Sequence, residues 1–161
     1  MNYQAVIKEL PSCIVYTKRF TVANFAVLNE VLPDLGRQIG EKYPTLKCAV
    51  PEYCFITYLD GEYRDKDIQV EYCEAVTKLM PDFDGIHFKE LPAVKAVSVM
   101  HKGSYSQLPQ AYAYIFQWLE ENGYQALERP RESYIDGVWN QAQEDDWLTE
   151  LQVPIVPRGN K

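Results

Sequence analysis

The sequence predicts an α+β fold in which one strand–strand–helix–strand–strand unit occurs twice. Three segments recur in the same order and at nearly equal separations: 8–11 with 89–92, 57–63 with 133–139, and 68–70 with 151–153. In addition, two segments with apolar residues three or four apart, typical of helices, lie between segments that alternate polar and apolar residues, typical of strands. We therefore expect one domain over 1–161, with repeat 1 at about 1–80 and repeat 2 at about 83–157.

Repeat 1 is predicted to contain strands at 3–10, 13–20, 49–59 and 67–76 and one helix at 22–43. The helix is indicated by an apolar stripe formed by Phe25, Leu28, Val31, Leu32, Leu35 and Ile39. Pro33 removes a backbone donor within this run, so the helix is expected to kink or restart there. Asp60 and Gly61 are the expected turn between the last two strands.

Repeat 2 follows the same order, with strands predicted at 86–91, 93–100, 131–136 and 148–156. Its helix carries an apolar stripe formed by Leu108, Ala111, Tyr112, Ile115, Trp118 and Leu119. The hydroxyl of Ser104 or Ser106 can cap the start of this helix, and Gly123 is expected to end it. Residues 141–146 are read as an acidic surface loop. Each repeat must cover one face of its sheet, so the two should share their interior.

Composition excludes several classes of protein. A hydrophobic content of 47% excludes disorder, and 16 Lys and Arg against 23 Asp and Glu give a net charge of −7. Such a surface repels a phosphate backbone and no basic patch is visible, so direct nucleic-acid binding is not expected. No apolar run reaches the roughly 18 residues that a membrane span needs. The amino-terminal residues resemble no secretion signal, and a cytoplasmic protein is expected.

The cysteines do not predict a metal or redox site. Cys13, Cys48, Cys54 and Cys73 are scattered, and no pair has the close spacing of a metal or redox motif. Only His87 and His101 could join them as ligands. We expect reduced, structural cysteines, no metal and no cofactor.

The stretch Arg131–Asp136 is the strongest candidate for a functional site. Glu132 and Tyr134 are next-but-one neighbours, so on a strand both side chains point to the same face. In a chain with 13% aromatic residues, this pair predicts a pocket for an apolar, cationic or protonatable small molecule. Glu132 is expected to be the only buried charge of that pocket.

The repeat gives an independent reason to single out Glu132. The match between 57–63 and 133–139 pairs Tyr134 with Tyr58, and extending it backwards pairs Glu132 with Ile56. The duplicated scaffold thus tolerates an apolar residue at this position, whereas a buried carboxylate costs several kcal/mol unless it is paired. In the alternative interpretation, Glu132 lies on an exposed strand in a salt bridge to Arg131 or Lys95 and contributes only to solubility.

Other candidate side chains have both a functional and a structural interpretation. Tyr105 stands at a strand-to-helix turn, where functional side chains gather. Trp139 could cover the pocket mouth or anchor its loop. Tyr112, Phe116 and Trp118 lie on the helix, where packing on the sheet is the default. His101 could be a base, although a structural role is the simpler interpretation.

Several segments together resemble the GyrI-like family, the effector-binding domains found alone and at the carboxyl end of bacterial multidrug-sensing transcription activators. They are 101–105, Ala111 and Tyr112, Trp118 and Leu119, 122–124, 132–134 and 149–154. The resemblance implies a duplicated α+β unit, an antiparallel sheet with pseudo-twofold symmetry, and a ligand pocket at the seam with Glu132 as its acidic floor. Two departures are noted: no helix-turn-helix precedes Tyr3, so the chain is not expected to be the activator itself, and Pro33 could reshape one wall of the pocket.

The resemblance implies binding of lipophilic, often cationic, aromatic molecules by a stand-alone sensor or sequestering domain. The expected ligand-binding residues are Glu132, Tyr134, Tyr58, Ile56, Tyr105, Tyr112 and Trp139. A first alternative is a hydrolase that detoxifies strained, cyclopropane-type electrophiles, with Glu132 and Tyr134 as catalytic residues, because acid–base assistance suits an electrophile already poised to react. A second alternative is a protein-interaction module that restrains DNA gyrase, with acidic charge imitating nucleic acid. A separate regulator protein is a further possible partner.

Overall fold

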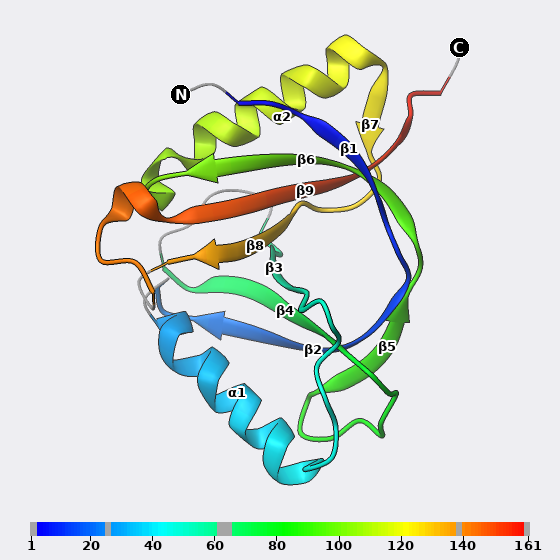
Figure 1. Ribbon diagram of the computed structural model, residues 1–161, viewed down its shortest axis with the longest axis vertical. Helices are drawn as coiled ribbons and strands as arrows, with labels where there is room; N and C mark the ends of the chain where they lie inside the picture. Colours follow the sequence, from blue (N-terminus) through cyan, green and yellow to red (C-terminus); the bar gives the residue numbers. More distant parts are fainter. Residues whose placement is uncertain (1–2, 25–26, 61–65, 138–139, 160–161) are drawn as a thin grey trace. The chain divides into compact units, whose positions relative to one another are not determined.

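The computed structural model describes residues 3–24, 27–60, 66–137 and 140–159. The chain divides into two units: Met1–Pro11 with Ala93–Lys161 forms unit 1, and Ser12–Pro92 forms unit 2. Each unit contains an antiparallel sheet and one long helix, which confirms the α+β class (Figure 1). Neither helix is long and apolar enough to cross a membrane, as judged over the described residues.

In unit 1 the strands are ordered β1-β6-β9-β8, and β7 also pairs with β9. The bounds are β1 Val6–Leu10, β6 Val94–Lys102, β7 Tyr124–Ala126, β8 Arg131–Asp136 and β9 Leu148–Pro157. Helix α2, Leu108–Asn122, follows the short helix η2, Tyr105–Gln107, and lies along one face of this sheet (Figure 1). Another short helix, η3, Glu144–Asp146, is exposed within the predicted acidic loop.

The core of unit 1 lies between α2 and the sheet. It is formed by buried side chains of β6, β9 and α2: Val97, Val99, Leu108, Ala111, Ile115, Leu119, Leu151, Val153 and Ile155. Each fully buried Val, Leu or Ile of this kind stabilises the fold by about 1.5–3 kcal/mol. Gly123 ends α2 in the left-handed conformation, as predicted. The Ser104 hydroxyl accepts from the Ser106 amide and so caps the short helix η2, whereas α2 itself begins after Gln107 without a side-chain cap.

In unit 2 the strands are ordered β5-β2-β4-β3. The bounds are β2 Cys13–Val22, β3 Cys54–Tyr58, β4 Ile68–Val76 and β5 His87–Leu91, with helix α1 at Leu28–Lys42. Leu35 and Ile39 of α1 pack on Tyr16, Val76 and Ile86, on the face that α1 covers (Figure 1).

Some predicted bounds were wrong. The helix was expected to begin at 22, but Val22 instead pairs with Ile68 in the ladder between β2 and β4, so α1 begins only at Leu28. Pro33 lies inside α1 without dividing it. The strand expected from 49 begins at Cys54, and β7 was not predicted. Gly61, part of the predicted turn, lies outside the described residues.

Apart from β7, the two units have the same order of elements along the chain, with β6, α2, β8 and β9 in unit 1 matching β2, α1, β3 and β4 in unit 2. In each sheet the outer strand comes from the start of the other predicted repeat: β1 pairs with β6, and β5 pairs with β2. The registers also correspond, since Ile56 lies opposite Tyr72 where Glu132 lies opposite Leu151.

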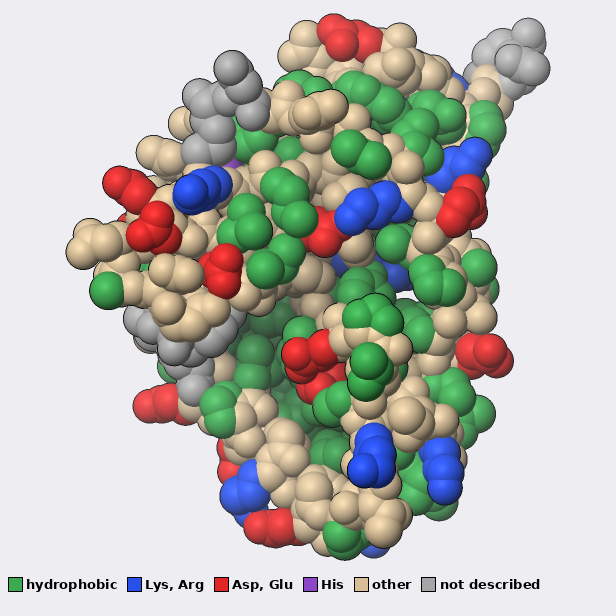
Figure 2. Space-filling model, in the orientation of Figure 1, with side chains coloured by type: hydrophobic (Ala, Val, Ile, Leu, Met, Phe, Trp, Pro, Cys, Tyr) green, Lys and Arg blue, Asp and Glu red, His purple; other side chains and the backbone are tan. Residues whose placement is uncertain are grey.

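The surface drawn in Figure 2 is mixed in charge. Its Lys and Arg side chains stand singly or in small groups among carboxylates and hydrophobic side chains. On the described part of this face there is no continuous basic surface.

Candidate ligand-binding site

Glu132 is the second residue of β8 and lies opposite Leu151 of β9. Since directly paired residues point to the same face of a sheet, and Leu151 packs beneath α2, the Glu132 side chain also points to the helix-covered face. It is only 5% exposed. Strand alternation places Tyr134 on the same face, opposite Thr149, as the sequence predicts.

Two phenols hold the Glu132 carboxylate from different elements. The Tyr134 hydroxyl donates to Oε1 over 2.6 Å, from the same strand. The Tyr112 hydroxyl donates to Oε2 from α2. Tyr112 can reach it because its neighbours Ala111 and Ile115 on the helix pack directly on the sheet. Tyr112 is therefore a partner of Glu132 and not only a core side chain.

Burial dominates the electrostatics of this carboxyl. Removal from water raises the pKa of Glu132, and the hydrogen bonds from Tyr112 and Tyr134 offset part of that rise. Within the described residues, no Lys, Arg or His lies at ion-pair distance from Glu132. Arg131, the next residue along β8, extends its guanidinium to Glu128 at 3.4 Å. The alternative of an exposed, salt-bridged Glu132 therefore does not match its surroundings.

An aromatic wall continues from Glu132 toward the surface. The Tyr105 ring lies 5.5 Å from the Tyr134 ring in an edge-on arrangement and 4.9 Å from the Trp147 ring. Burial, and secondarily the Glu132 charge, raise the pKa of the Tyr105 phenol. Because Tyr105 is 36% exposed, the wall connects solvent with the buried carboxyl.

Trp147 was missed by the sequence interpretation. It ends the acidic loop just before β9, and its indole N–H donates to the Gln141 carbonyl over 3.2 Å. An aromatic residue between an acidic loop and an apolar strand was the only available signal, and it does not reveal that the ring meets Tyr105.

The remaining predicted site residues lie elsewhere. Ile56 and Tyr58 belong to β3 in unit 2, where Ile56 is buried opposite Tyr72 and Tyr58 lies opposite Val70. Trp139 lies outside the described residues. The participation of these three side chains in ligand binding stays a prediction.

His101 is fully buried and both of its ring nitrogens are engaged. Nδ1 lies 2.9 Å from the Tyr3 hydroxyl, and Nε2 lies 3.0 Å from the Ser104 carbonyl. Since that carbonyl can only accept, Nε2 carries the proton and Nδ1 accepts from Tyr3. This geometry favours the structural interpretation of His101.

Two other features do not resemble a functional centre. The described residues contain no group of three His, Cys, Asp or Glu side chains arranged to hold a metal ion.

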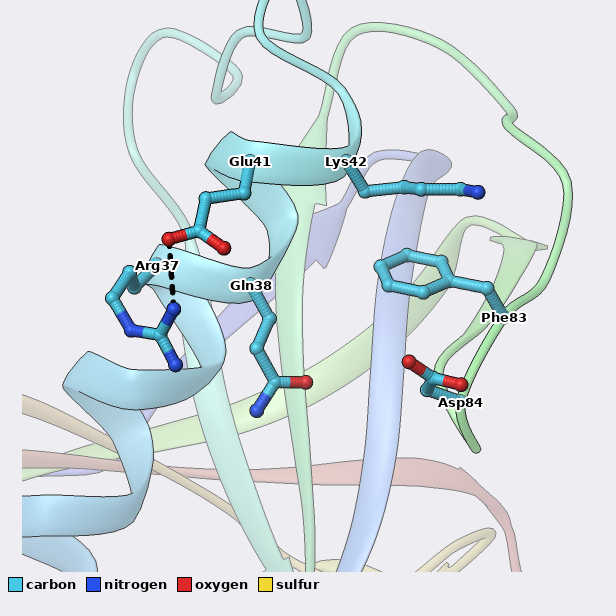
Figure 3. A pocket seen from close by; sticks show the side chains of 6 residues that line it. All are labelled: Arg37, Gln38, Glu41, Lys42, Phe83 and Asp84. Carbon is cyan, nitrogen blue, oxygen red and sulfur yellow. Dashed lines mark hydrogen bonds and ion pairs between the residues drawn. The ribbon is translucent and has the colours of Figure 1, made fainter.

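A surface hollow of about 460 Å³ in unit 2 is lined by Arg37, Gln38, Glu41, Lys42, Phe83 and Asp84 (Figure 3). Arg37 is paired with Glu41 over 2.8 Å, and among the described lining residues only Phe83 is apolar, so this hollow suits an apolar ligand poorly.

The sequence over residues 5–156 matches the family described as the GyrI-like small molecule binding domain. The chain belongs to this family. The match covers nearly the whole GyrI-like domain described above, including β8, α2 and the loop that carries Trp147.

Solved structures agree with this assignment. The GyrI-like domain is 45% identical to the C-terminal domain of EcmrR, whose crystal structure it matches with a TM-score of 0.88, covering 98% of this chain and 99% of that one. It matches EcmrR in a cryo-EM structure of an EcmrR–DNA complex with 44% identity and the same TM-score, covering 98% of this chain. There it spans only 58% of the EcmrR chain.

More distant relatives share the fold alone. A hydrolase from Listeria innocua is 12% identical, with a TM-score of 0.66 and coverage of 95% of this chain and 92% of that one. SAV2435 bound to tetraphenylphosphonium is 13% identical, with a TM-score of 0.52 and coverage of 97% and 94%. No curated protein sequence matched the GyrI-like domain.

Proposed function

We propose that this GyrI-like domain binds lipophilic, cationic aromatic molecules and that Glu132 selects their positive charge. The observation that carries the proposal is a carboxyl buried beneath aromatic rings, with two phenols as its hydrogen-bond donors. Both donors are neutral groups, so they satisfy the oxygens without neutralising the charge.

A bound cation would provide the positive charge that offsets the buried negative charge of Glu132. Desolvation makes an ionised Glu132 costly, and a positive charge brought in by a ligand would offset that cost. The faces of Tyr105 and Tyr134 would add about 0.5–2 kcal/mol each through cation–π contact. A neutral ligand of the same shape gains the apolar contact but not the charge, so discrimination between the two is the expected property of the site.

The experiment is a titration with tetraphenylphosphonium, followed by tryptophan fluorescence because Trp147 contacts Tyr105. The neutral comparison ligand is triphenylphosphine oxide. Wild-type protein should prefer the cation, and Glu132→Gln should weaken cation binding about tenfold or more, since it removes the coulombic attraction of a buried carboxylate and tenfold corresponds to only about 1.4 kcal/mol. Glu144→Gln, an exposed carboxylate on η3, is the matched control and should bind as wild type. Equal affinity in Glu132→Gln, or equal affinity for the neutral ligand, would overturn the proposal.

Hydrolysis of a strained electrophile is the second candidate. The observation that favours it is the raised pKa of Glu132 beside two phenols, since a base with a raised pKa accepts a proton more readily near neutrality. Glu132 would take a proton from a water molecule whose oxygen bonds to a cyclopropane carbon. The strained C–C bond would break, and its electron pair would pass to a conjugated carbonyl oxygen of the substrate, to which the Tyr134 hydroxyl would donate. Product formation from a cyclopropane-type electrophile should then vanish in Glu132→Gln while some ligand binding remains. The Listeria innocua hydrolase shares only the fold and adds no argument about chemistry.

A role in regulation is also part of the proposal. EcmrR occurs in a complex with DNA, and the present chain spans only part of EcmrR. By analogy, ligand binding here would be transmitted to a DNA-binding regulator, in a separate protein or in the same one. The gyrase interaction and the cytoplasmic location stay predictions from the sequence.

We further propose that the chain is a single domain formed by duplication. Corresponding polar networks in the two units support this. In unit 1, Ser98 and Lys8 bond the Glu150 carboxylate at 2.7 and 2.8 Å. In unit 2, Thr17 bonds the Glu71 carboxylate at 2.6 Å, and Lys89 lies 3.7 Å from it.

A further inference from the structure

Unit 2 also holds a carboxylate surrounded by phenols. Glu74 of β4 lies opposite Tyr16 of β2, on the face that α1 covers. The hydroxyls of Tyr16 and Tyr72 each donate to its Oε1 over 2.9 Å. The Cys48 thiol donates to Oε2 over 2.8 Å. The carboxylate is thus held by three donors from β2, β4 and the segment before β3.

The corresponding place in unit 1 is entirely apolar. Thr17 and Ser98 occupy equivalent positions in their polar networks, so Tyr16 corresponds to Val97. Val97 lies opposite Val153, and both are fully buried. Glu74 therefore occupies the position of a core valine. Packing alone accounts for Val153, whereas a carboxyl at this place calls for another explanation.

The three donors around Glu74 remain neutral. Burial is the main cause that raises the pKa of the Tyr16 and Tyr72 phenols, and Glu74 raises both further. Burial and the bond to Glu74 raise the pKa of the Cys48 thiol to about 12. In the described part of unit 2, no Lys, Arg or His forms an ion pair with Glu74. When Glu74 is ionised, the cluster has one negative charge and no positive one.

This cluster can accept one more hydrogen bond and is reachable from solvent. A carboxylate has about four acceptor positions, and three donors are present. The open position is on Oε2, on the side of the Cys48 thiol. Cys48 is exposed and Glu74 is half-buried, whereas Tyr16 is 3% exposed. A ligand would therefore approach beside Cys48.

We propose that Glu74, with Tyr16 and Tyr72, is a second binding site, which takes a protonated amine that carries an apolar group. The ammonium donates one N–H to Oε2. The half-buried Tyr72 ring offers a face that attracts a cation, whereas the buried Tyr16 only holds the carboxylate through its hydroxyl. This site belongs to unit 2 and does not depend on the function proposed for Glu132.

The test uses calorimetric titration with benzylamine in the Glu132→Gln background, where cation binding at the first site is weakened. Calorimetry is used because it measures binding directly and needs no tryptophan beside the ligand. Benzylamine should bind. Benzyl alcohol, its neutral counterpart, should bind at least about tenfold more weakly, given the cost of a lost charge-assisted contact. Adding Glu74→Gln should reduce benzylamine affinity by the same factor. Glu30→Gln, which removes an exposed carboxylate from the first turn of α1 in the same unit, is the matched control and should change nothing.

A second measurement keeps the proposal testable if Glu74→Gln does not fold. In ¹⁵N-labelled wild-type protein, benzylamine should shift the amide signals of β4 around Glu74, and benzyl alcohol should not. Absence of these shifts at millimolar amine, equal shifts with the alcohol, or unchanged affinity in Glu74→Gln would each overturn the second site. Failure of tetraphenylphosphonium to bind at Glu132 would leave this result unaffected, so the two proposals fail separately.

Discussion

The Tyr134 hydroxyl lies 2.6 Å from Oε1 of Glu132, which is its next-but-one neighbour on the same strand. The other oxygen is held from α2 by Tyr112, so the carboxyl links the helix to the sheet at a place where neighbouring contacts are apolar. This arrangement makes the charge of Glu132 matter for stability as well as for binding.

Glu132→Gln should be more stable than wild type above acidic pH. Burial raises the pKa of Glu132 above its ordinary value of 4.5, so the folded state binds this proton more tightly than the unfolded chain. The associated stability is fully present below pH 4.5 and is lost as pH rises through the folded pKa. Glutamine has no such proton, so the unfolding free energy of Glu132→Gln should exceed that of wild type by the order of 1 kcal/mol at these pH values. Urea unfolding at several pH values measures it, and parallel curves for the two proteins would contradict the prediction.

In Tyr112→Phe and in Tyr134→Phe, the stability that comes from the Glu132 proton should be lost at a higher pH than in wild type. Both phenols lower the pKa of Glu132 by hydrogen bonding to its charged form, so loss of either lets burial raise the pKa further. Each variant should also lose about 1 kcal/mol of unfolding free energy, the usual worth of one hydrogen bond. Tyr114→Phe, on the same helix without a bond to Glu132, is the comparison. A pH profile unchanged from wild type in both variants would show that the phenols do not control the carboxyl.

Lys8→Met should destabilise the protein by about 1–3 kcal/mol, because it removes a donor from the buried Glu150 carboxylate. Burial alone would raise the pKa of Glu150, but hydrogen bonds from Lys8, Ser98 and Gln152 lower it overall. The stability from this network is therefore present above pH 4.5 and is lost as pH falls below it. Lys89→Met is the control, since Lys89 lies 3.7 Å from Glu71 and should matter less. Denaturant unfolding at neutral and acidic pH measures the loss of unfolding free energy in each variant. An equal loss in Lys8→Met and Lys89→Met would argue against this account.

Gly123→Ala should cost about 1 kcal/mol, because residue 123 has φ of +77° and a side chain disfavours this conformation. Nothing lies within 4 Å of an added Cβ, so the cost is conformational and not steric. Gly36→Ala, inside α1 and also without neighbours, should have the opposite sign and stabilise by about 0.5–1 kcal/mol. Thermal unfolding of the two variants checks the contrast, and a shift in the same direction for both would contradict it.

Local patterns were sufficient to predict much of this site. Strand alternation placed Glu132 and Tyr134 on one face, and the internal repeat related Glu132 to Ile56, as the two registers also do. The apolar stripe of α2 was likewise predicted, because helical periodicity is a property of a short segment.

The Glu74 cluster could not be found in this way, since it depends on pairing between distant strands. The third sequence match aligned 68–70 with 151–153, and so paired Val70 with Val153. The ladders instead place Glu74 opposite Tyr16 and Val153 opposite Val97, which makes Glu74 the counterpart of Val153. The sequence match is therefore out of register, and this conceals the replacement of a core valine by a carboxyl.

The contact of Trp147 with Tyr105 was missed for the same reason. The two residues lie on either side of β7 and β8 in the chain, and only the folded sheet brings their rings together. No pattern within a short segment of sequence contains this information.

Each sheet takes its outer strand from the other predicted repeat, and this has a consequence for how the chain folds. The ladder of β1 joins Val6 to Ser98, so β1 finds its neighbour β6 only after α1 and the strands β2 to β5 have been made. Such distant pairing gives a high contact order and slow folding. A chain cut near residue 80 would yield two fragments, each with an unpaired sheet edge, and each would need the other fragment to supply the missing strand.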